Sequence, residues 1–142
     1  MGIVYAPIIL KNAGDITSVD RGIIAEREIR ETAVTALVDT GAGTLVIDEE
    51  TCGKLGLKIK GLRGAYIAKG ERAICKITEP VEIHWKDRQS VCSAVVMQGL
   101  DQVLLGAIPL EEMDLVVNPA QSELTGAHGD EVMMYNLYYR II

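Results

Sequence analysis

The sequence predicts an all-β protein that folds as a single domain over its 142 residues. Two observations support this prediction, one for the fold class and one for the single domain. Most of the chain consists of short apolar runs separated by turns, which is typical of strands, and few segments carry helix signals. The chain is also long enough to bury one hydrophobic core but short for two domains.

The first third of the chain is expected to contain three strands. Residues 4–11 predict a strand, and Pro7 favours an edge position because proline cannot donate to a strand ladder. Residues 12–15 are typical of a turn. Residues 27–39 predict a long central strand, and residues 45–47 predict a short one.

The clearest helix is predicted immediately afterwards, over residues 48–56. Asp48 is a favourable N-cap, and Glu49 and Glu50 lie in the first turn, where the helix dipole favours negative charge. Gly56 then ends the helix.

The middle of the chain predicts two hairpins, each formed by two apolar runs around a charged turn. The paired runs are 63–68 with 73–77, and 81–85 with 91–96. Beyond them, Pro109 is suited to the first turn of a short helix that ends at Met113.

The end of the chain predicts further strands at 115–117 and 122–124 and a last one at 131–142. The last segment has one continuous apolar face, which is long for a chain end. It is therefore expected either to pair with a partner chain or to close its own sheet.

The composition excludes several classes of protein. A net charge of −6 with 49% hydrophobic residues describes a globular chain rather than a disordered one. The acidic balance and the scattered Lys and Arg residues argue against nucleic acid as a partner. No apolar run approaches the ~20 residues of a membrane span, and no signal peptide is recognisable, so a cytoplasmic location is expected.

No cofactor or metal is expected. Cys52, Cys75 and Cys92 are widely spaced and predict buried, reduced thiols rather than a zinc site. Among other polar residues, His84 is expected on a strand surface, and His128 has no visible partner. Asp101 is expected to serve a turn, and Asp114 to be either a turn residue or a solvated one.

The strongest functional signal is the stretch Ala-Leu-Val-Asp-Thr-Gly-Ala-Gly at residues 36–43. It is an apolar strand that ends in Asp39 and continues into a glycine turn. Burying an unpaired carboxylate costs several kcal/mol, so such groups gather at working sites.

Asp39-Thr40-Gly41 resembles the catalytic loop of the aspartic proteases, which reads Asp-Thr/Ser-Gly. Residues 103–110, Val-Leu-Leu-Gly-Ala-Ile-Pro-Leu, resemble the second signature of that family, apolar residues followed by glycine and a short helix. The order and spacing of the two segments fit, over roughly residues 26–124. Because only one Asp-Thr-Gly is present, the chain is similar to the retroviral-type (retropepsin-like) enzymes, as a single-domain cellular or bacterial-like member.

The resemblance implies one lobe of the aspartic protease fold over residues 1–142, a closed β-barrel or sandwich with one or two short helices. It also implies an aspartic endopeptidase that acts as a homodimer on a peptide or protein substrate. The chemistry needs two carboxylates that share one proton, and each subunit supplies Asp39. The strand predicted at 131–142 would then contribute to the dimer interface.

Supporting roles follow for residues beside the catalytic aspartate. Thr40 is expected to form a hydrogen bond across the two-fold axis, and Gly41 to allow a sharp turn and close approach of substrate. Ala42 cannot donate a hydrogen bond to the carboxylate as serine would, so a pH optimum above about 3.5 is expected. Leu105 and Gly106, from the second signature, are expected to support the loop.

The first hairpin occupies the place of the family's flap, the hairpin that closes over bound peptide. The flap candidates are Tyr66, Lys69, Gly70 and Glu71. The alternative is an ordinary surface hairpin.

The chain departs from the retroviral pattern next to both signatures. Retroviral enzymes carry two aspartates where this chain has Gly43 and Thr44, and an arginine where it has Ala107. Substrate preference therefore cannot be transferred. The alternative to an active peptidase is a silent or latent dimer that acts as a peptide-binding or assembly scaffold.

Overall fold

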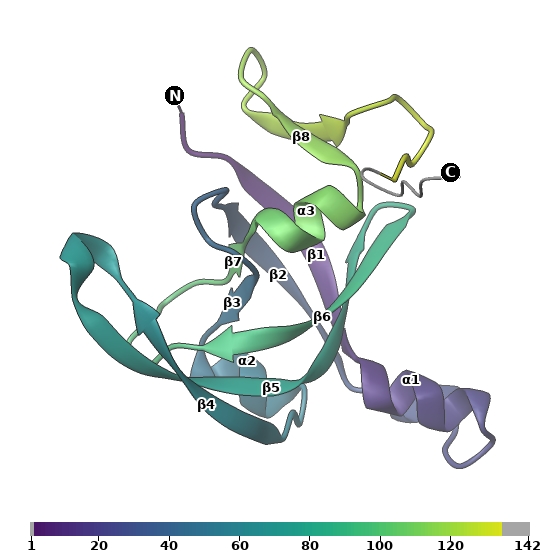
Figure 1. Cartoon of the computed structure of the whole chain (residues 1–142). Coiled ribbons are helices and arrows are strands. Elements are labelled where there is room, and N and C mark those ends of the chain that lie inside the picture. The colour runs from purple at the N-terminus through teal and green to yellow at the C-terminus, as the bar shows by residue number, and fades with distance from the viewer. Residues whose placement is uncertain (1, 135–142) are drawn as a thin grey trace, which may run out of the picture.

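The computed structural model describes residues 2–134, and these are mainly β-strands joined by turns and short helices (Figure 1). In chain order the elements are β1 (Tyr5–Asn12), α1 (Ala13–Asp20), the 3₁₀ turn η1 (Glu26–Glu28), β2 (Glu31–Val38), β3 (Leu45–Ile47), α2 (Glu49–Lys54), β4 (Ile59–Tyr66), the 3₁₀ turn η2 (Ala68–Gly70), β5 (Arg72–Trp85), β6 (Arg88–Val96), β7 (Leu104–Leu105), α3 (Ala107–Glu112), β8 (Leu115–Asn118) and β9 (Glu123–Gly126). None of the helices within these residues is long and apolar enough to cross a membrane.

Seven strands form one sheet, in the order β1-β2-β7-β3-β6-β5-β4. β1 also pairs with β5, through Ile9–Asn12, so the series of strands from β1 to β5 returns on itself around the core. β4 lies beyond this ring, and β8 and β9 form a separate two-stranded sheet. The predicted all-β class is confirmed, with a curved, sandwich-like sheet.

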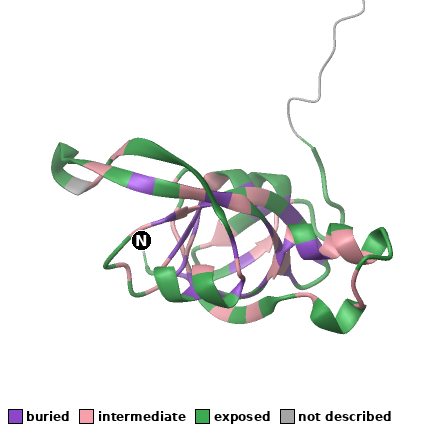
Figure 2. Ribbon diagram, turned by 90° about the horizontal axis from the view of Figure 1, so that it is seen from below, coloured by how far each residue is buried: buried purple, intermediate pink, exposed green. Residues whose placement is uncertain are grey.

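The core lies inside this ring, and along strands such as β1 buried residues alternate with more exposed ones (Figure 2). β1 is a clear example, since Ala6, Ile8 and Leu10 are buried while the residues between them are exposed. Burial of apolar area at about 25 cal/mol per Å² is the main favourable contribution to such a core.

Most of the expected elements are present. α2 follows Asp48 and ends before Gly56, whose φ of +60° suits glycine. The hairpins β4–β5 and β5–β6 are also present, and β5 is one continuous strand that belongs to both. Its register shifts between Ile77 and Pro80, which interrupts the ladder between the two hairpins.

Two predictions for the first third were wrong. Residues 12–15 are not a turn but the start of α1, because the Asn12 side chain accepts a hydrogen bond from the Asp15 backbone N–H (3.0 Å) and caps the helix. The strand expected from residue 27 begins only at Glu31, since Glu26–Glu28 form a 3₁₀ turn.

The last predicted strand, 131–142, lies mostly outside the described residues. Of its first four residues, Glu131 forms an isolated bridge with His128, and no strand begins there. The short helix predicted around Pro109 is α3, which begins at Ala107, so Pro109 lies in its first turn as expected.

A buried polar cluster fixes the end of β1 against the start of β2. The Asp15 carboxylate accepts hydrogen bonds from the backbone N–H of Arg30 (2.9 Å) and from its guanidinium (2.9 and 2.8 Å). The Asn12 side chain donates to the Leu55 carbonyl (2.8 Å), so the cluster also reaches the end of α2. The guanidinium of Arg30 holds the pKa of Asp15 below its usual range.

A second close contact fixes β7. This strand is parallel to β2 and antiparallel to β3, and therefore lies between them. A Cβ on Gly106, which follows β7, would lie 2.2 Å from the Thr44 carbonyl oxygen and 2.6 Å from that of Ala42. Only glycine allows these backbones to come so close.

We expect Asp15→Asn to lower the melting temperature by several degrees at pH 7, because the charged hydrogen bonds to Arg30 are lost. A carboxyl group with a lowered pKa in the folded state stabilises the fold above its unfolded pKa of about 3.9. That contribution disappears as the pH falls through the folded pKa, so the difference from wild type should shrink between about pH 5 and 2. Asp20→Asn, at the exposed end of α1, is the matched control and should change the melting curve little.

We expect Gly106→Ala to lower the free energy of unfolding by more than about 2 kcal/mol, because backbone atoms must move to admit the methyl group. Gly43→Ala is the control. Its Cβ would meet nothing within 4 Å, and Gly43 has no positive φ. Chemical denaturation of both variants tests this, and equal losses would contradict it.

Candidate active site

Asp39 stands where β2 ends and its loop to β3 begins. Its backbone N–H donates to the Leu105 carbonyl (3.0 Å), so the residue is held against β7. Leu37 donates in the same way to Val103 (2.8 Å). The Asp39 side chain is half-buried. The backbone that carries it is hydrogen-bonded to the β7 segment at Leu37 and at Asp39 itself.

The loop folds back onto the carboxylate. The Gly41 N–H donates to Oδ1 of Asp39 (2.9 Å), and the Ala42 N–H donates to the Asp39 carbonyl (3.1 Å). A Cβ on Gly41 would lie 3.2 Å from the same Oδ1, which is a tight contact. These bonds fix the direction of the side chain before any ligand arrives.

The start of α3 completes the loop. The N–H groups of Ala107 and Ile108 donate to the carbonyls of Ala42 (2.8 Å) and Gly43 (3.1 Å). The structure therefore brings together the two sequence segments, although more than 60 residues separate Ala42 from Ala107 in the printed sequence. Ala107, which replaces an arginine of the retroviral pattern, serves here through its backbone.

Thr40 is exposed, and it lies beside a mainly apolar hollow of about 430 Å³. The lining comes from the N-terminal segment, the end of β2, α3 and β8, including Val4, Val38, Leu110 and Val116. Thr40 of the Asp39 loop is therefore next to a mainly apolar surface.

The other side of the loop is anchored to β6. Thr44 Oγ1 donates to the Ser93 carbonyl (3.3 Å) and lies 3.7 Å from Cys92 Sγ. Burial raises the pKa of the Cys92 thiol, and burial also raises that of Cys52. Both thiols therefore remain protonated at neutral pH, and all three cysteines are free.

The flap candidates lie at the tip of the β4–β5 hairpin. Tyr66 ends β4, Lys69 and Gly70 form the turn with φ of +67° and +74°, and the Glu71 carbonyl accepts from the Ile67 N–H (2.8 Å). Among residues 2–134, no hydrogen bond or ion pair joins this tip to the loop at 39–43.

Sequence reasoning missed a polar cluster near the end of the described chain. His128 Nδ1 lies 2.8 Å from Oδ2 of the buried Asp114, so His128 does have a partner. Arg88, also buried, donates to the carbonyls of Met113 (2.8 Å), Asp114 (2.9 Å) and Gly129. No local pattern signals these pairings, which connect distant segments.

His84 forms a short contact with Glu82 on the same strand (Nε2 to Oε1, 2.7 Å). In the described part of the chain, no group of three or more His, Cys, Asp or Glu side chains is placed to hold a metal ion.

Comparison with known proteins agrees with this arrangement. A family model described as gag-polyprotein putative aspartyl protease matches residues 25–112, which contain the Asp39 loop, β7 and α3. The fold is similar to the retroviral protease-like domain of Ddi1 from Leishmania major, with 15% identity, a TM-score of 0.54 and 88% of each chain covered. No curated protein matches. Since the family model covers more than half of the 142 residues, the chain belongs to the family of gag-polyprotein putative aspartyl proteases.

Proposed function

We propose that this protein is an aspartic endopeptidase that acts as a homodimer. The observation that carries the proposal is the fixed position of Asp39, whose backbone N–H donates to the Leu105 carbonyl and whose carboxylate accepts from the Gly41 N–H. Membership of an aspartyl protease family supports the same reaction.

The need for a dimer follows from the chemistry. Two carboxylates at about 3 Å cannot both ionise, so one keeps a proton and acts as acid while the other acts as base. In the described part of this chain, no second carboxylate is hydrogen-bonded to Asp39 or its loop. A two-fold axis beside the loop would supply it.

In the proposed reaction, a water molecule lies between the two Asp39 side chains. The ionised carboxylate takes a proton from the water while the oxygen of that water attacks the peptide carbonyl carbon. The protonated carboxyl donates to the carbonyl oxygen, and a proton then passes to the leaving nitrogen. Gly41, Ala42, Leu105 and Gly106 keep the carboxylates in place, and no metal or cofactor takes part.

The surface beside Thr40 is suited to the partner subunit. It is a mainly apolar hollow, and Val116 and Ile108 nearby are 47% and 54% exposed. Thr40 of each subunit would bond across the axis, and segment 131–142 would pair between subunits. The β4–β5 hairpin, with Tyr66, Lys69, Gly70 and Glu71 at or near its tip, would serve as the flap.

We expect Asp39→Asn to abolish peptide cleavage, because an amide can neither take nor supply the required proton. Digestion of a library of unfolded-protein peptides from about pH 4 to 7.5 measures this, and it gives the pH optimum, which is expected above about pH 3.5. Asp101→Asn is the control, since Asp101 is exposed and lies outside the loop. Residual cutting by Asp39→Asn would contradict the proposal.

The same experiment separates the second candidate function, a peptide-binding or assembly scaffold. The departures at Gly43, Thr44 and Ala107 favour it, because they remove charged groups next to the site. No cleavage by a folded wild-type dimer, with peptide binding unchanged by Asp39→Asn, would support a scaffold or a latent enzyme.

We expect an excess of Asp39→Asn protein, mixed with wild type, to suppress cleavage by the wild-type protein. Mixed dimers contain one aspartate and cannot share a proton in the required way. The same excess of Asp101→Asn protein should leave the rate of cleavage undiminished.

A second measurement is the sedimentation of a chain shortened by residues 131–142, which should be monomeric if that segment joins the subunits. A wild-type monomer that cleaves peptides would exclude the dimeric mechanism.

A further inference from the structure

Positive charge gathers on one hairpin of this acidic protein. Residues 58–76, called here the basic arm, comprise β4, η2 and the first part of β5. The arm holds six of the 14 Lys and Arg residues but one of the 20 Asp and Glu residues, so its formal charge is +5 in a chain of −6. The six are Lys58, Lys60, Arg63, Lys69, Arg72 and Lys76.

This charge corrects the expectation that cations are merely scattered. Along the sequence successive members of the six are two to six positions apart and never adjacent. Antiparallel pairing brings the two halves of the arm side by side. The rest of the chain carries the compensating excess of acid.

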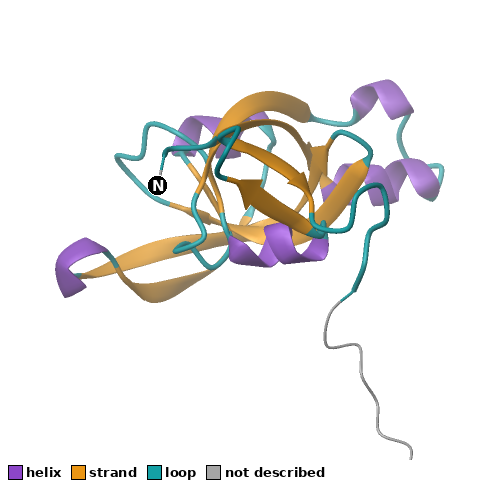
Figure 3. Cartoon of the chain, turned by 90° about the horizontal axis from the view of Figure 1, so that it is seen from above, coloured by secondary structure: helices purple, strands orange, loops and turns teal. Residues whose placement is uncertain are grey.

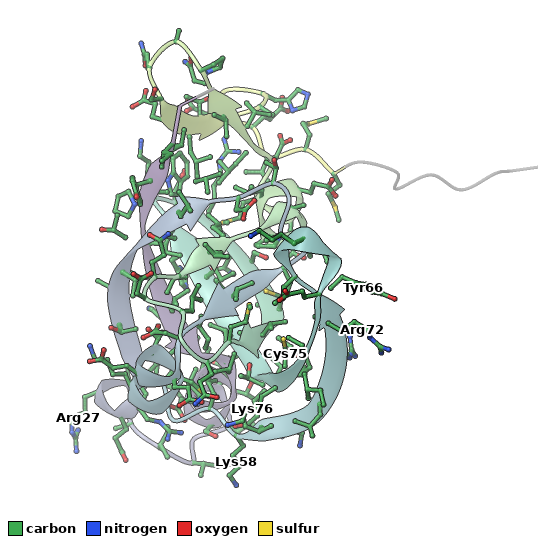
Figure 4. The ribbon with its side chains drawn as sticks, turned by 90° about the vertical axis from the view of Figure 1, so that its left-hand side faces the viewer. Arg27, Lys58, Tyr66, Arg72, Cys75 and Lys76 are labelled. Atoms are coloured by element: carbon green, nitrogen blue, oxygen red, sulfur yellow. The ribbon has the colours of Figure 1, made fainter. Side chains whose placement is uncertain are left out.

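The cations of the arm are mostly unused within the protein. Of the six, only Lys76 forms an ion pair among the described residues, with Glu49 of α2 at 3.6 Å. Arg72 lies over the ring of Tyr66, 5.9 Å from its centroid. In Figure 4 the side chains of Tyr66 and Arg72 project together away from the body. Keeping like charges together costs repulsion, so an oppositely charged partner would be favourable.

Exposed apolar side chains lie among these charges. Leu62, Tyr66 and Ile74 are 66%, 80% and 78% exposed. Leu62 is opposite Lys76, and Tyr66 is opposite Arg72, in the strand register. Residues that face each other in an antiparallel pair share one face, so this face of the arm carries both apolar and cationic groups. Aromatic residues and arginine together are typical of protein interfaces.

The arm also offers an unpaired strand edge. Among the strands of residues 2–134, β4 is the last of the sheet and pairs only with β5. Figure 3 shows the hairpin extending from the body, with η2 at its tip. An extended polypeptide can add to such an edge by backbone hydrogen bonds.

The base of the arm leads toward the catalytic loop. Lys60 and Arg63 line a hollow of about 370 Å³ together with Pro80 and Ser93. Ser93 is the residue whose carbonyl accepts from Thr44, in the loop that follows Asp39. A chain docked on the arm would therefore reach the neighbourhood of the loop.

We propose that the basic arm docks an extended, acidic polypeptide segment, and thereby favours substrates with Asp and Glu residues near the cleaved bond. Nucleic acid fits less well, because the body of the protein is strongly acidic and the exposed Leu62 and Ile74 offer aliphatic rather than stacking surface. The preference for acidic substrates rests on the proposed peptidase function, whereas the docking of an acidic segment does not depend on it.

Binding is tested with full-length Asp39→Asn protein, which removes cleavage from the measurement. Two fluorescein-labelled peptides share one apolar centre, which is flanked by Asp and Glu in one and by Asn and Gln in the other. Fluorescence anisotropy should show that the acidic peptide binds about tenfold more tightly in low salt. The preference should fall sharply in about 0.5 M NaCl, where exposed charges are screened.

The arm is tested by Lys60→Glu combined with Arg63→Glu, which should abolish the preference. The matched control is Arg21→Glu combined with Arg27→Glu, an equal change of charge at exposed sites. Arg27 lies away from the arm (Figure 4), so the control should keep most of the preference. Circular dichroism and melting curves confirm that both variants fold.

Several results would overturn the docking proposal. These are equal affinity for the two peptides, equal losses in the two double variants, or tighter binding of a single-stranded oligonucleotide than of the acidic peptide. Dissociation of dimers by the arm variant alone would assign the arm to a second copy instead. Cleavage without any preference for acidic substrates would contradict the docking proposal but support the peptidase function. Binding of the acidic peptide without any cleavage by wild type would support docking but contradict the peptidase function.

Discussion

The close approach of backbone at Gly106 is the constraint on which the site depends. β7 has only two residues, but it pairs with β2 on one side and β3 on the other. The chain then passes so near Thr44 and Ala42 that a Cβ would overlap their carbonyl oxygens. Because of this contact, the first turn of α3 can donate to the Asp39 loop, and the carboxylate gains a rigid base.

Buried polar groups perform a different task, which is to join segments that apolar packing alone would leave adjustable. Asn12 and Asp15 tie β1, α1 and the start of β2 together, and Arg88 ties β6 to the segment after α3. Asn12, Asp15 and Arg88 each have charged or backbone partners, as burial in a low dielectric requires. These contacts hold the ring of strands in register around the core.

Positive and negative charge are distributed unevenly over the protein. The body is acidic, while the arm at the edge of the sheet is basic and carries exposed apolar side chains. The two parts share one strand, β5, whose register shifts between Ile77 and Pro80. The rigidly held Asp39 loop and a charged projecting hairpin are thus built into the same sheet, which relates the proposed chemistry to the proposed choice of substrate.

The local elements and the loop that carries Asp39 can be predicted from short stretches of sequence. α2, the hairpins and the aspartate-glycine turn depend on capping, alternation and turn residues within a few positions, so they can be predicted. α1 was missed because Asn12 and Gly14 are as typical of a turn as of a capped helix start. Other features follow from long-range packing. They are the insertion of β7, the pairing of β1 with β5, the contact of His128 with Asp114 and the gathering of charge on the arm. These features depend on which distant segments pack together, and that is set by the balance of the whole core rather than by any local pattern.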